Sequence, residues 1–303
     1  MRNKFHILIL FLLLLAGGGK AFAQSDSIAK AVLLLQDQTM PHDKAVKQAL
    51  ETIDRAILES NTAKNPYAWY VRGYVYKEYY KTFESGNKKS KTRIDAVAFL
   101  KKALELDTAK EYTPNIKATL KYTGSTFYND ASSSLDETNY QIAIEDYSKY
   151  KECMLLAEPG YNLKKGEVDF KTVLADVYVK IFRSDIKTNV QFFGMAEESY
   201  KQVIALDSNN RAANLNLAFL YYNYGVDIIN AMPVDAEIIV IENIQEDAKN
   251  NFKKALPYAQ KSEALNPKDM RVLKCLQGIY FSLYEFEKSD AYKLAIEKLE
   301  KEK

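Results

Sequence analysis

Four side chains suited to ligand binding occur at regular spacing between positions 67 and 77. Tyr67, Tyr70 and Tyr74 are separated by three and four residues, and Lys77 follows three residues later. Residues at these spacings lie along one face of a helix. A row of aromatic rings with a cation at its end suits an extended or helical peptide that carries apolar and acidic side chains. The spacing therefore predicts a peptide-binding stripe.

Residues that could carry catalysis or hold a metal are few. His42 is the only histidine after position 23, which argues strongly against a cysteine–histidine pair, a zinc site or a histidine general base. We expect His42, which follows Pro41, to be a solvated turn residue. The sequence shows no glycine-rich phosphate loop and no recognisable catalytic pair of carboxylates. We therefore expect no catalytic residue, no metal and no cofactor, and a hydrolase built from carboxylates and tyrosines is the least favoured alternative.

Two predicted helices, 66–80 and 94–107, must position this stripe. The first places Trp69, Gly73 and Tyr76 on one face, at spacings of four and three. A glycine inside a helix costs about 0.8–1 kcal/mol relative to alanine, so a glycine between two large aromatic residues indicates that a partner helix comes close there. One such pair cannot bury its apolar faces alone, which predicts stacked repeats. The second helix carries the complementary small, large, small series of Ala96, Leu100 and Ala103.

The segment 66–107 resembles a tetratricopeptide repeat, a helix-turn-helix unit of about 34 residues. The family's motif is W-x2-L-G-x2-Y in the first helix, A-x3-F and a small residue in the second, and then a proline. Arg72 replaces the leucine of this motif, and Thr108 replaces its proline. The connection around 84–91 is about eleven residues longer than in the family, which we interpret as a loop insertion. The matching residues are Trp69, Gly73, Tyr76, Ala96, Leu100 and Ala103.

The pattern recurs along the rest of the chain. The small position of the first helix is expected at 73, 124, 175, 218 and 277, and the last helix is expected to pack through Ala291 and Ala295. The resemblance implies an all-α fold, an α-solenoid of about six stacked antiparallel helix pairs. Because repeats in a solenoid contact only their neighbours, we expect Cys153 and Cys275 to be buried and not bridged. The expected pairs cover approximately 25–60, 66–107, 114–157, 167–207, 211–266 and 269–301.

The resemblance also implies a binding surface. In the family, four positions of each first helix line a concave groove, where exposed aromatic residues are the usual anchors of protein recognition. This implies a non-enzymatic scaffold or assembly factor with an unidentified protein partner, and the alternative is a glycan- or peptidoglycan-binding module. A clamp for the carboxylate of a chaperone tail is not supported, because the groove position that such domains fill with asparagine never holds it here. The groove residues are Tyr67, Tyr70, Tyr74, Lys77, Lys121, Tyr128, Leu215, Phe219 and Tyr222.

Residues 1–23 are predicted to be a secretory signal peptide. Arg2 and Lys4 precede an apolar run of about twelve residues, which is too short for the ~20 residues of a membrane-spanning helix, and Ala21-Phe22-Ala23 forms a small-x-small cleavage site. An uncleaved membrane anchor is the alternative. A cleavage site followed by Gln24 resembles those of exported proteins of Gram-negative bacteria. We therefore expect a periplasmic or secreted protein with no stable membrane insertion after cleavage.

Charge argues against a nucleic-acid partner. Three of the 42 basic residues lie in the first 23 positions, which leaves the rest of the chain one base short of its 40 acids. The remaining chain is close to neutral and lacks the excess of positive charge that nucleic-acid binding requires.

Local sequence features give three further expectations. Pro257 lies inside a predicted helix, and we expect a kink and not a break because the apolar period continues across it. The β-branched run 237–241 is compatible with a strand, but a helix is favoured because no second strand could pair with it. The basic run 85–93 and the run 130–139 are expected to be solvated loops, and the former could alternatively contact an anionic surface.

Overall fold

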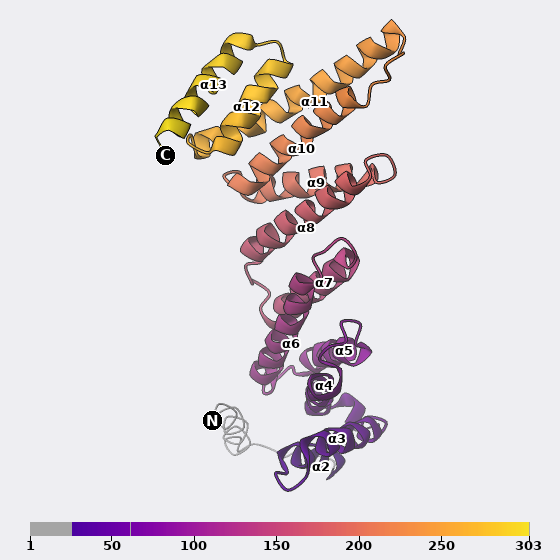
Figure 1. The fold of residues 1–303 in the computed structure, drawn as a ribbon. Coiled ribbons are helices and arrows are strands. Elements are labelled where there is room, and N and C mark those ends of the chain that lie inside the picture. The colour runs from indigo at the N-terminus through magenta and orange to yellow at the C-terminus, as the bar shows by residue number, and fades with distance from the viewer. Residues whose placement is uncertain (1–25, 61, 303) are drawn as a thin grey trace. The chain divides into compact units, whose positions relative to one another are not determined.

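The computed structural model describes residues 26–60 and 62–302, and the predicted signal peptide at 1–23 lies outside them. In this described part the chain is all-α, with twelve α-helices and no strand (Figure 1). A 3-10 turn at Thr62–Lys64 precedes α4, and a π-helical turn at Tyr80–Glu84 continues it. The α-helices are α2 (Asp26–Gln36), α3 (His42–Ala56), α4 (Pro66–Tyr79), α5 (Lys91–Leu106), α6 (Thr113–Ser133), α7 (Tyr140–Ala157), α8 (Lys164–Ser184), α9 (Gln191–Leu206), α10 (Arg211–Asn230), α11 (Ile238–Leu265), α12 (Met270–Ser282) and α13 (Phe286–Lys301).

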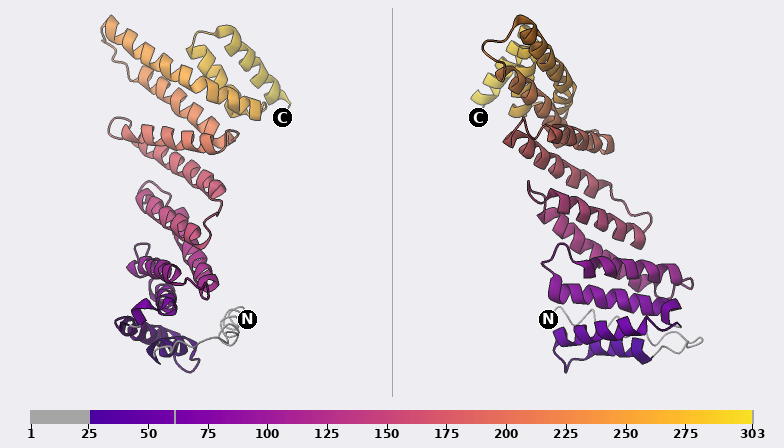
Figure 2. Two further views of the ribbon diagram at one scale, coloured as in Figure 1. Left: turned by 180° about the vertical axis from the view of Figure 1, so that it is seen from behind. Right: turned by 90° about the vertical axis from the view of Figure 1, so that its right-hand side faces the viewer.

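The helices belong to two compact units. Unit 1 comprises Met1–Thr126 and Glu152–Pro159, and unit 2 comprises Phe127–Lys151 and Gly160–Lys303. Within unit 1, α2 contacts α3, α3 contacts α4, and α4 contacts α5; within unit 2, the same order holds from α8 to α13. First helices of successive pairs also touch, α2 with α4 and α10 with both α8 and α12, so pairs stack within each unit (Figure 2). The predicted all-α fold of consecutive helix pairs is confirmed.

Side-chain caps fix where several of these helices begin. Asn65 precedes α4, and its Oδ1 accepts a hydrogen bond from the amide of Tyr67 at 2.9 Å. Pro66 follows at the first helical position, where its missing N–H costs nothing. Ser90 caps α5 in the same way, by accepting from the amide of Arg93 at 3.0 Å. These caps fix the first residues of α4 and α5.

Gly73 lies where α4 and α5 come closest. A Cβ atom at this position would lie 2.7 Å from Cγ of Leu100 and 3.2 Å from the carbonyl oxygen of Ala96. Both residues are fully buried, as is Ala103, so the neighbouring helix has little room to yield. The close approach predicted from the glycine is confirmed, and its partners belong to the predicted small, large, small series.

Arg72 has a structural role that explains the missing leucine. Its Nε donates to Asp54 of α3 at 2.8 Å, and its guanidinium carbon lies 4.0 Å from the ring centroid of Phe99 in α5. The hydroxyl of Tyr76 donates to the same carboxylate at 2.8 Å. A half-buried ion pair and a stacked guanidinium thus join α3, α4 and α5.

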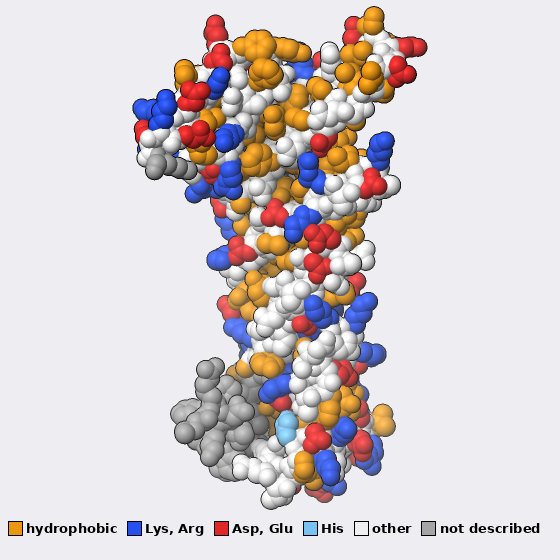
Figure 3. All heavy atoms as spheres, in the orientation of Figure 1, with side chains coloured by type: hydrophobic (Ala, Val, Ile, Leu, Met, Phe, Trp, Pro, Cys, Tyr) orange, Lys and Arg blue, Asp and Glu red, His pale blue; other side chains and the backbone are white. Residues whose placement is uncertain are grey.

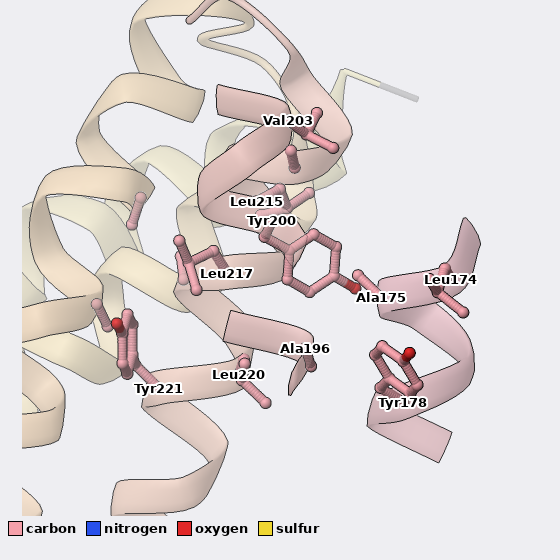
Figure 4. Packing of buried hydrophobic residues seen from close by; sticks show 14 of the residues in the cluster. Leu174, Ala175, Tyr178, Ala196, Tyr200, Val203, Leu215, Leu217, Leu220 and Tyr221 are labelled. Carbon is pink, nitrogen blue, oxygen red and sulfur yellow. The ribbon is translucent and has the colours of Figure 1, made fainter. Parts of the chain in front are cut away.

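Unit 2 has its own apolar core, drawn in Figure 4. Tyr200 of α9 is almost fully buried, and its ring extends toward α8, where Ala175 leaves room for it (Figure 4). Gly225 of α10 is a close approach like Gly73, because a Cβ there would lie 2.6 Å from Cε1 of Phe252 in α11. Small residues facing large side chains therefore pack helix against helix in this unit as well.

The basic run 85–93 is not a solvated loop throughout, and this expectation is wrong at its end. α5 already begins at Lys91, and Arg93 is completely buried. Its guanidinium donates to the hydroxyl of Tyr80 at 3.0 Å and to the carbonyl oxygen of Lys88 at 3.1 Å. The run 130–139 is also partly helical, because α6 continues to Ser133.

Other local expectations have mixed outcomes. Residues 238–241 are helical, as expected, and α11 continues without a break through Pro257. At 277 the residue is glutamine, and its carbonyl oxygen accepts from the hydroxyl of Ser289 in α13 at 3.1 Å. The next residue, Gly278, approaches the preceding pair, because a Cβ there would overlap with Tyr222 of α10. In α13, Ala291 is exposed, and the buried residues are Ser289 and Ile296. Cys153 and Cys275 are both buried and are not joined by a disulfide bond, as expected.

We predict that Gly73→Ala lowers the free energy of unfolding of unit 1 by about 1–3 kcal/mol, because the added methyl group overpacks the contact with Leu100. Trp69, the only tryptophan, lies in the same helix and reports its unfolding in a denaturant titration followed by fluorescence. Gly86→Ala is the control, since the added methyl group there would have no atom within 4 Å and the backbone φ is not positive. Equal unfolding curves for the two variants would refute the close approach.

Candidate functional site

Unit 1 contains a cavity of about 650 Å³. Its wall is formed mainly by one face of α4, which carries the predicted aromatic stripe. The opposite wall comes from α2, from the start of α3 and from α6. The lining residues that bear on ligand binding are Val32, Leu35, His42, Tyr67, Tyr70, Tyr74, Lys77, Glu78, Lys81 and Tyr122.

Tyrosine rings form the apolar part of this cavity. The ring centroids of Tyr67 and Tyr70 are 6.2 Å apart, as are those of Tyr70 and Tyr74. Tyr112, in the turn before α6, covers the first ring at a centroid distance of 4.9 Å. The exposed fractions of Tyr67 and Tyr70 are only 8% and 6%. The expectation that these rings lie open in a groove is therefore wrong for these two, because α2 and the start of α6 cover them and enclose a cavity.

A charged cluster closes one end of the aromatic wall. Lys77 forms a buried ion pair with Glu78, and Lys81 lies 3.7 Å from the other oxygen of the same carboxylate. The ammonium of Lys77 lies 3.9 Å from the ring centroid of Tyr74 and 5.2 Å from that of Tyr122. Two cations thus meet one carboxylate, and one positive charge remains uncompensated within the cluster.

Burial controls the protonation of these groups. It raises the pKa of Tyr70 to about 12 and also raises the pKa of Tyr74, where nearby Glu78 adds to the effect. The phenol groups therefore stay protonated at neutral pH and can donate hydrogen bonds. Burial lowers the pKa of Lys77, although Glu78 opposes this. Burial alone would raise the pKa of Glu78, but Lys77 and Lys81 outweigh it and hold that pKa below its usual value.

This arrangement can hold a ligand that is apolar or aromatic along most of its length and anionic at one end. The rings provide contact area, the hydroxyl groups provide donors, and the lysines attract a carboxylate. His42, the first residue of α3, is exposed as expected and lies at the cavity. Within the described residues, no group of histidine, cysteine, aspartate or glutamate side chains is arranged to hold a metal ion.

The structure does not bring the nine predicted groove residues into one site. Lys121 forms an exposed ion pair with Glu158, with 2.9 Å between Nζ and Oε2, and does not line the cavity. Tyr122, the next residue, takes that place and is 44% exposed. The cavity-facing side of α6 is therefore displaced by one residue from the predicted side.

The other predicted residues lie in unit 2. Tyr128 packs against Tyr150 with ring centroids 5.0 Å apart, and Tyr222 packs against Phe252 at 5.7 Å. Phe219 lines a separate cavity of about 370 Å³. Leu215 is buried and lines another of about 300 Å³.

The cavity that contains Phe219 has a polar group at its base. Asp176 accepts hydrogen bonds from the hydroxyl of Tyr200 and from the amide of Asn216, the latter at 2.9 Å. Burial, with Asp176 as the next largest cause, raises the pKa of Tyr200. These bonds hold the carboxylate in place between α8, α9 and α10, so its role is structural.

Several residues of the unit 1 cavity are absent from the prediction. Lys81 follows Glu78 by three residues and Lys77 by four, so this helical spacing could have indicated a charge cluster. Val32 and Leu35 could not be found in this way, because no sequence rule states that α2 packs over α4.

No protein-family model and no curated protein sequence matches this chain. No helix in the described ranges has the length and apolar character needed to cross a bilayer.

We predict that Glu78→Gln destabilises unit 1 by about 3–5 kcal/mol at pH 7, because Lys77 is left buried without its carboxylate. The pKa of Glu78 is lower in the folded than in the unfolded chain, so its stabilisation is complete above its ordinary pKa of 4.5 and is lost as the pH falls through the folded value. The difference from the wild type should therefore shrink below about pH 4.

The matched control is Glu105→Gln, which removes an exposed ion pair with Lys102 of 3.5 Å and should cost less than about 0.5 kcal/mol. Fluorescence of Trp69 during urea unfolding, measured at several pH values, gives both results. The assignment of Lys77 and Glu78 as a buried ion pair would be contradicted if Glu78→Gln lost no more stability than Glu105→Gln. It would also be contradicted if the stability lost in Glu78→Gln did not change with pH.

Proposed function

We propose that this chain is an exported, non-enzymatic repeat protein of the tetratricopeptide type that binds a segment of a protein partner. The close approach at Gly73, the buried Ala96, Leu100 and Ala103, and the stacking of consecutive helix pairs support the family assignment. The apolar run and the small-x-small site in residues 1–23 support export to the periplasm or beyond the cell of a Gram-negative bacterium.

The observation that carries the binding proposal is the tyrosine-lined cavity of unit 1 with its excess positive charge. Its volume of about 650 Å³ accommodates a few side chains of a peptide and not a folded surface. The partner segment inserts apolar or aromatic side chains between Tyr70, Tyr74 and Tyr122. An acidic side chain or a C-terminal carboxylate of the segment contacts Lys77 and Lys81.

Binding is tested by placing a photoreactive amino acid at Tyr122 in the native cell and identifying the cross-linked species, with the same substitution at Tyr284 as control. Both side chains are exposed, but only Tyr122 lies at the cavity. We expect a protein adduct from position 122 alone. Adducts of equal kind and yield at both positions would contradict the assignment of the cavity.

Affinity of the purified chain for a peptide from the identified protein then tests the residues. The double variant Tyr122→Ala with Lys81→Ala changes two exposed cavity residues and should weaken binding at least about tenfold with unchanged helical content. Lys121→Ala, one residue outside the cavity, is the control and should bind like the wild type. The glycan alternative would be supported if the chain bound purified peptidoglycan in place of a protein segment and the same double variant abolished that binding.

A further inference from the structure

The tip of the hairpin formed by α10 and α11 carries an apolar surface that the fold does not use. We define the hairpin tip as residues 229–247. All the buried residues of α11 lie at or after Ala248, so its first turns have no helix packed over them. Five large hydrophobic side chains of the tip are exposed, with exposed fractions between 40% and 107%: Ile229, Val234, Ile238, Ile239 and Val240.

Carboxylates surround this apolar surface. No lysine or arginine occurs between Arg211 and Lys249, a stretch that includes the whole tip. None of the tip's acidic side chains has an ion-pair partner among the residues that the structure describes. Figure 3 shows hydrophobic and acidic side chains gathered at the end of this hairpin, at the upper right, with no basic side chain among them. The acidic residues are Asp235, Glu237, Glu242, Glu246 and Asp247.

Helical spacing places the two kinds of side chain in continuous rows. Ile239 precedes Glu242 by three residues and Glu246 by seven. Val240 precedes Asp247 by seven residues. Residues at these spacings lie on one side of a helix. Each exposed apolar side chain is therefore followed along α11 by a carboxylate.

The fold itself does not require hydrophobic residues here. Isoleucine and valine are poorer helix formers than alanine, leucine or glutamate, so they do not stabilise an exposed first turn. Exposed apolar side chains gathered at one place and rimmed by polar groups are typical of an interaction site.

We propose that the hairpin tip binds a cationic amphipathic helix of a partner protein. The apolar face of such a helix covers the neighbouring side chains of Ile238 and Ile239, and its flanking lysine or arginine side chains meet the carboxylates. A second copy of the same tip does not fit, because a symmetric contact would place like charges opposite each other. An anionic membrane or nucleic acid is repelled for the same reason. This site lies in unit 2 and does not depend on the cavity of unit 1.

The test uses two synthetic peptides of about five helical turns with the same leucine face, one with lysine and one with glutamate on its polar face. Fluorescence anisotropy measures their binding to the mature chain at an ionic strength of about 0.15 M. We expect the lysine peptide to bind at least about tenfold more tightly than the glutamate peptide, and to weaken as salt is raised. Equal affinities for the two peptides, or no binding of the lysine peptide, would overturn the proposal.

Variants locate the binding site. Ile238→Ser with Ile239→Ser should weaken binding of the lysine peptide at least about tenfold, whereas Leu294→Ser, at an equally exposed residue of α13, should leave it unchanged. Glu242→Lys with Glu246→Lys leaves three carboxylates against two lysines on the tip and should remove most of the preference for the lysine peptide. Equal loss in the Leu294→Ser control, or an undiminished preference, would contradict the assignment.

Two other occupants are tested with the same variants. Light scattering detects self-association, and flotation with phosphatidylcholine vesicles detects insertion into an uncharged bilayer. Loss of either behaviour in the Ile238→Ser, Ile239→Ser variant would overturn the proposal in favour of that occupant. We expect that the wild type does not self-associate through this surface and does not float with the vesicles.

Discussion

The structure of unit 1 depends on how closely α4 approaches α5. At Gly73 the absence of a side chain lets Leu100 come within a distance that no Cβ atom would permit. This contact fixes which side of α4 packs against α5, and therefore which side is left for other contacts. The same constraint recurs in unit 2, where Gly225 faces Phe252. A helix pair buries its apolar side chains only by such approaches and by stacking on the next pair.

The cavity is a consequence of this arrangement. One side of α4 packs against Leu100 and Ala96. The side that carries the stripe beginning at Tyr67 therefore faces α2 and α6. Neighbouring side chains already hold these rings in place, so the proposed ligand would lose little entropy to ordering them. Glu78 stays ionised beside these rings because Lys77 and Lys81 together hold its pKa below the usual value. Burial lowers the pKa of Lys77, and the contact with Glu78 opposes this effect. Packing and the proposed binding thus use different sides of one helix, and each restricts the residues that the other can tolerate.

Helix pairing and the close approach could be predicted from the sequence, because a glycine between aromatic residues is costly in a helix unless a partner helix needs the space. The candidate site could be predicted only in part. Tyr67, Tyr70, Tyr74 and Lys77 do share one side of a helix, but their burial depends on Tyr112 and on α2, which lie far away in sequence. The displacement from Lys121 to Tyr122 also depends on contacts between helices. Packing between helices decides which residues of a helix face a given neighbour, and a repeat motif does not specify this packing.

The most direct test of the close approach is a double-mutant cycle between Gly73→Ala and Leu100→Ala, with unfolding of unit 1 followed by fluorescence of Trp69. The two residues are in contact, so the effects of the substitutions should not add. Truncation of Leu100 removes the atoms that a new methyl group at position 73 would meet. We expect the double variant to be more stable than the sum of the single losses implies, by about 1 kcal/mol or more. Additivity within about 0.5 kcal/mol would show that α4 and α5 do not meet at this point and would contradict the packing described for unit 1.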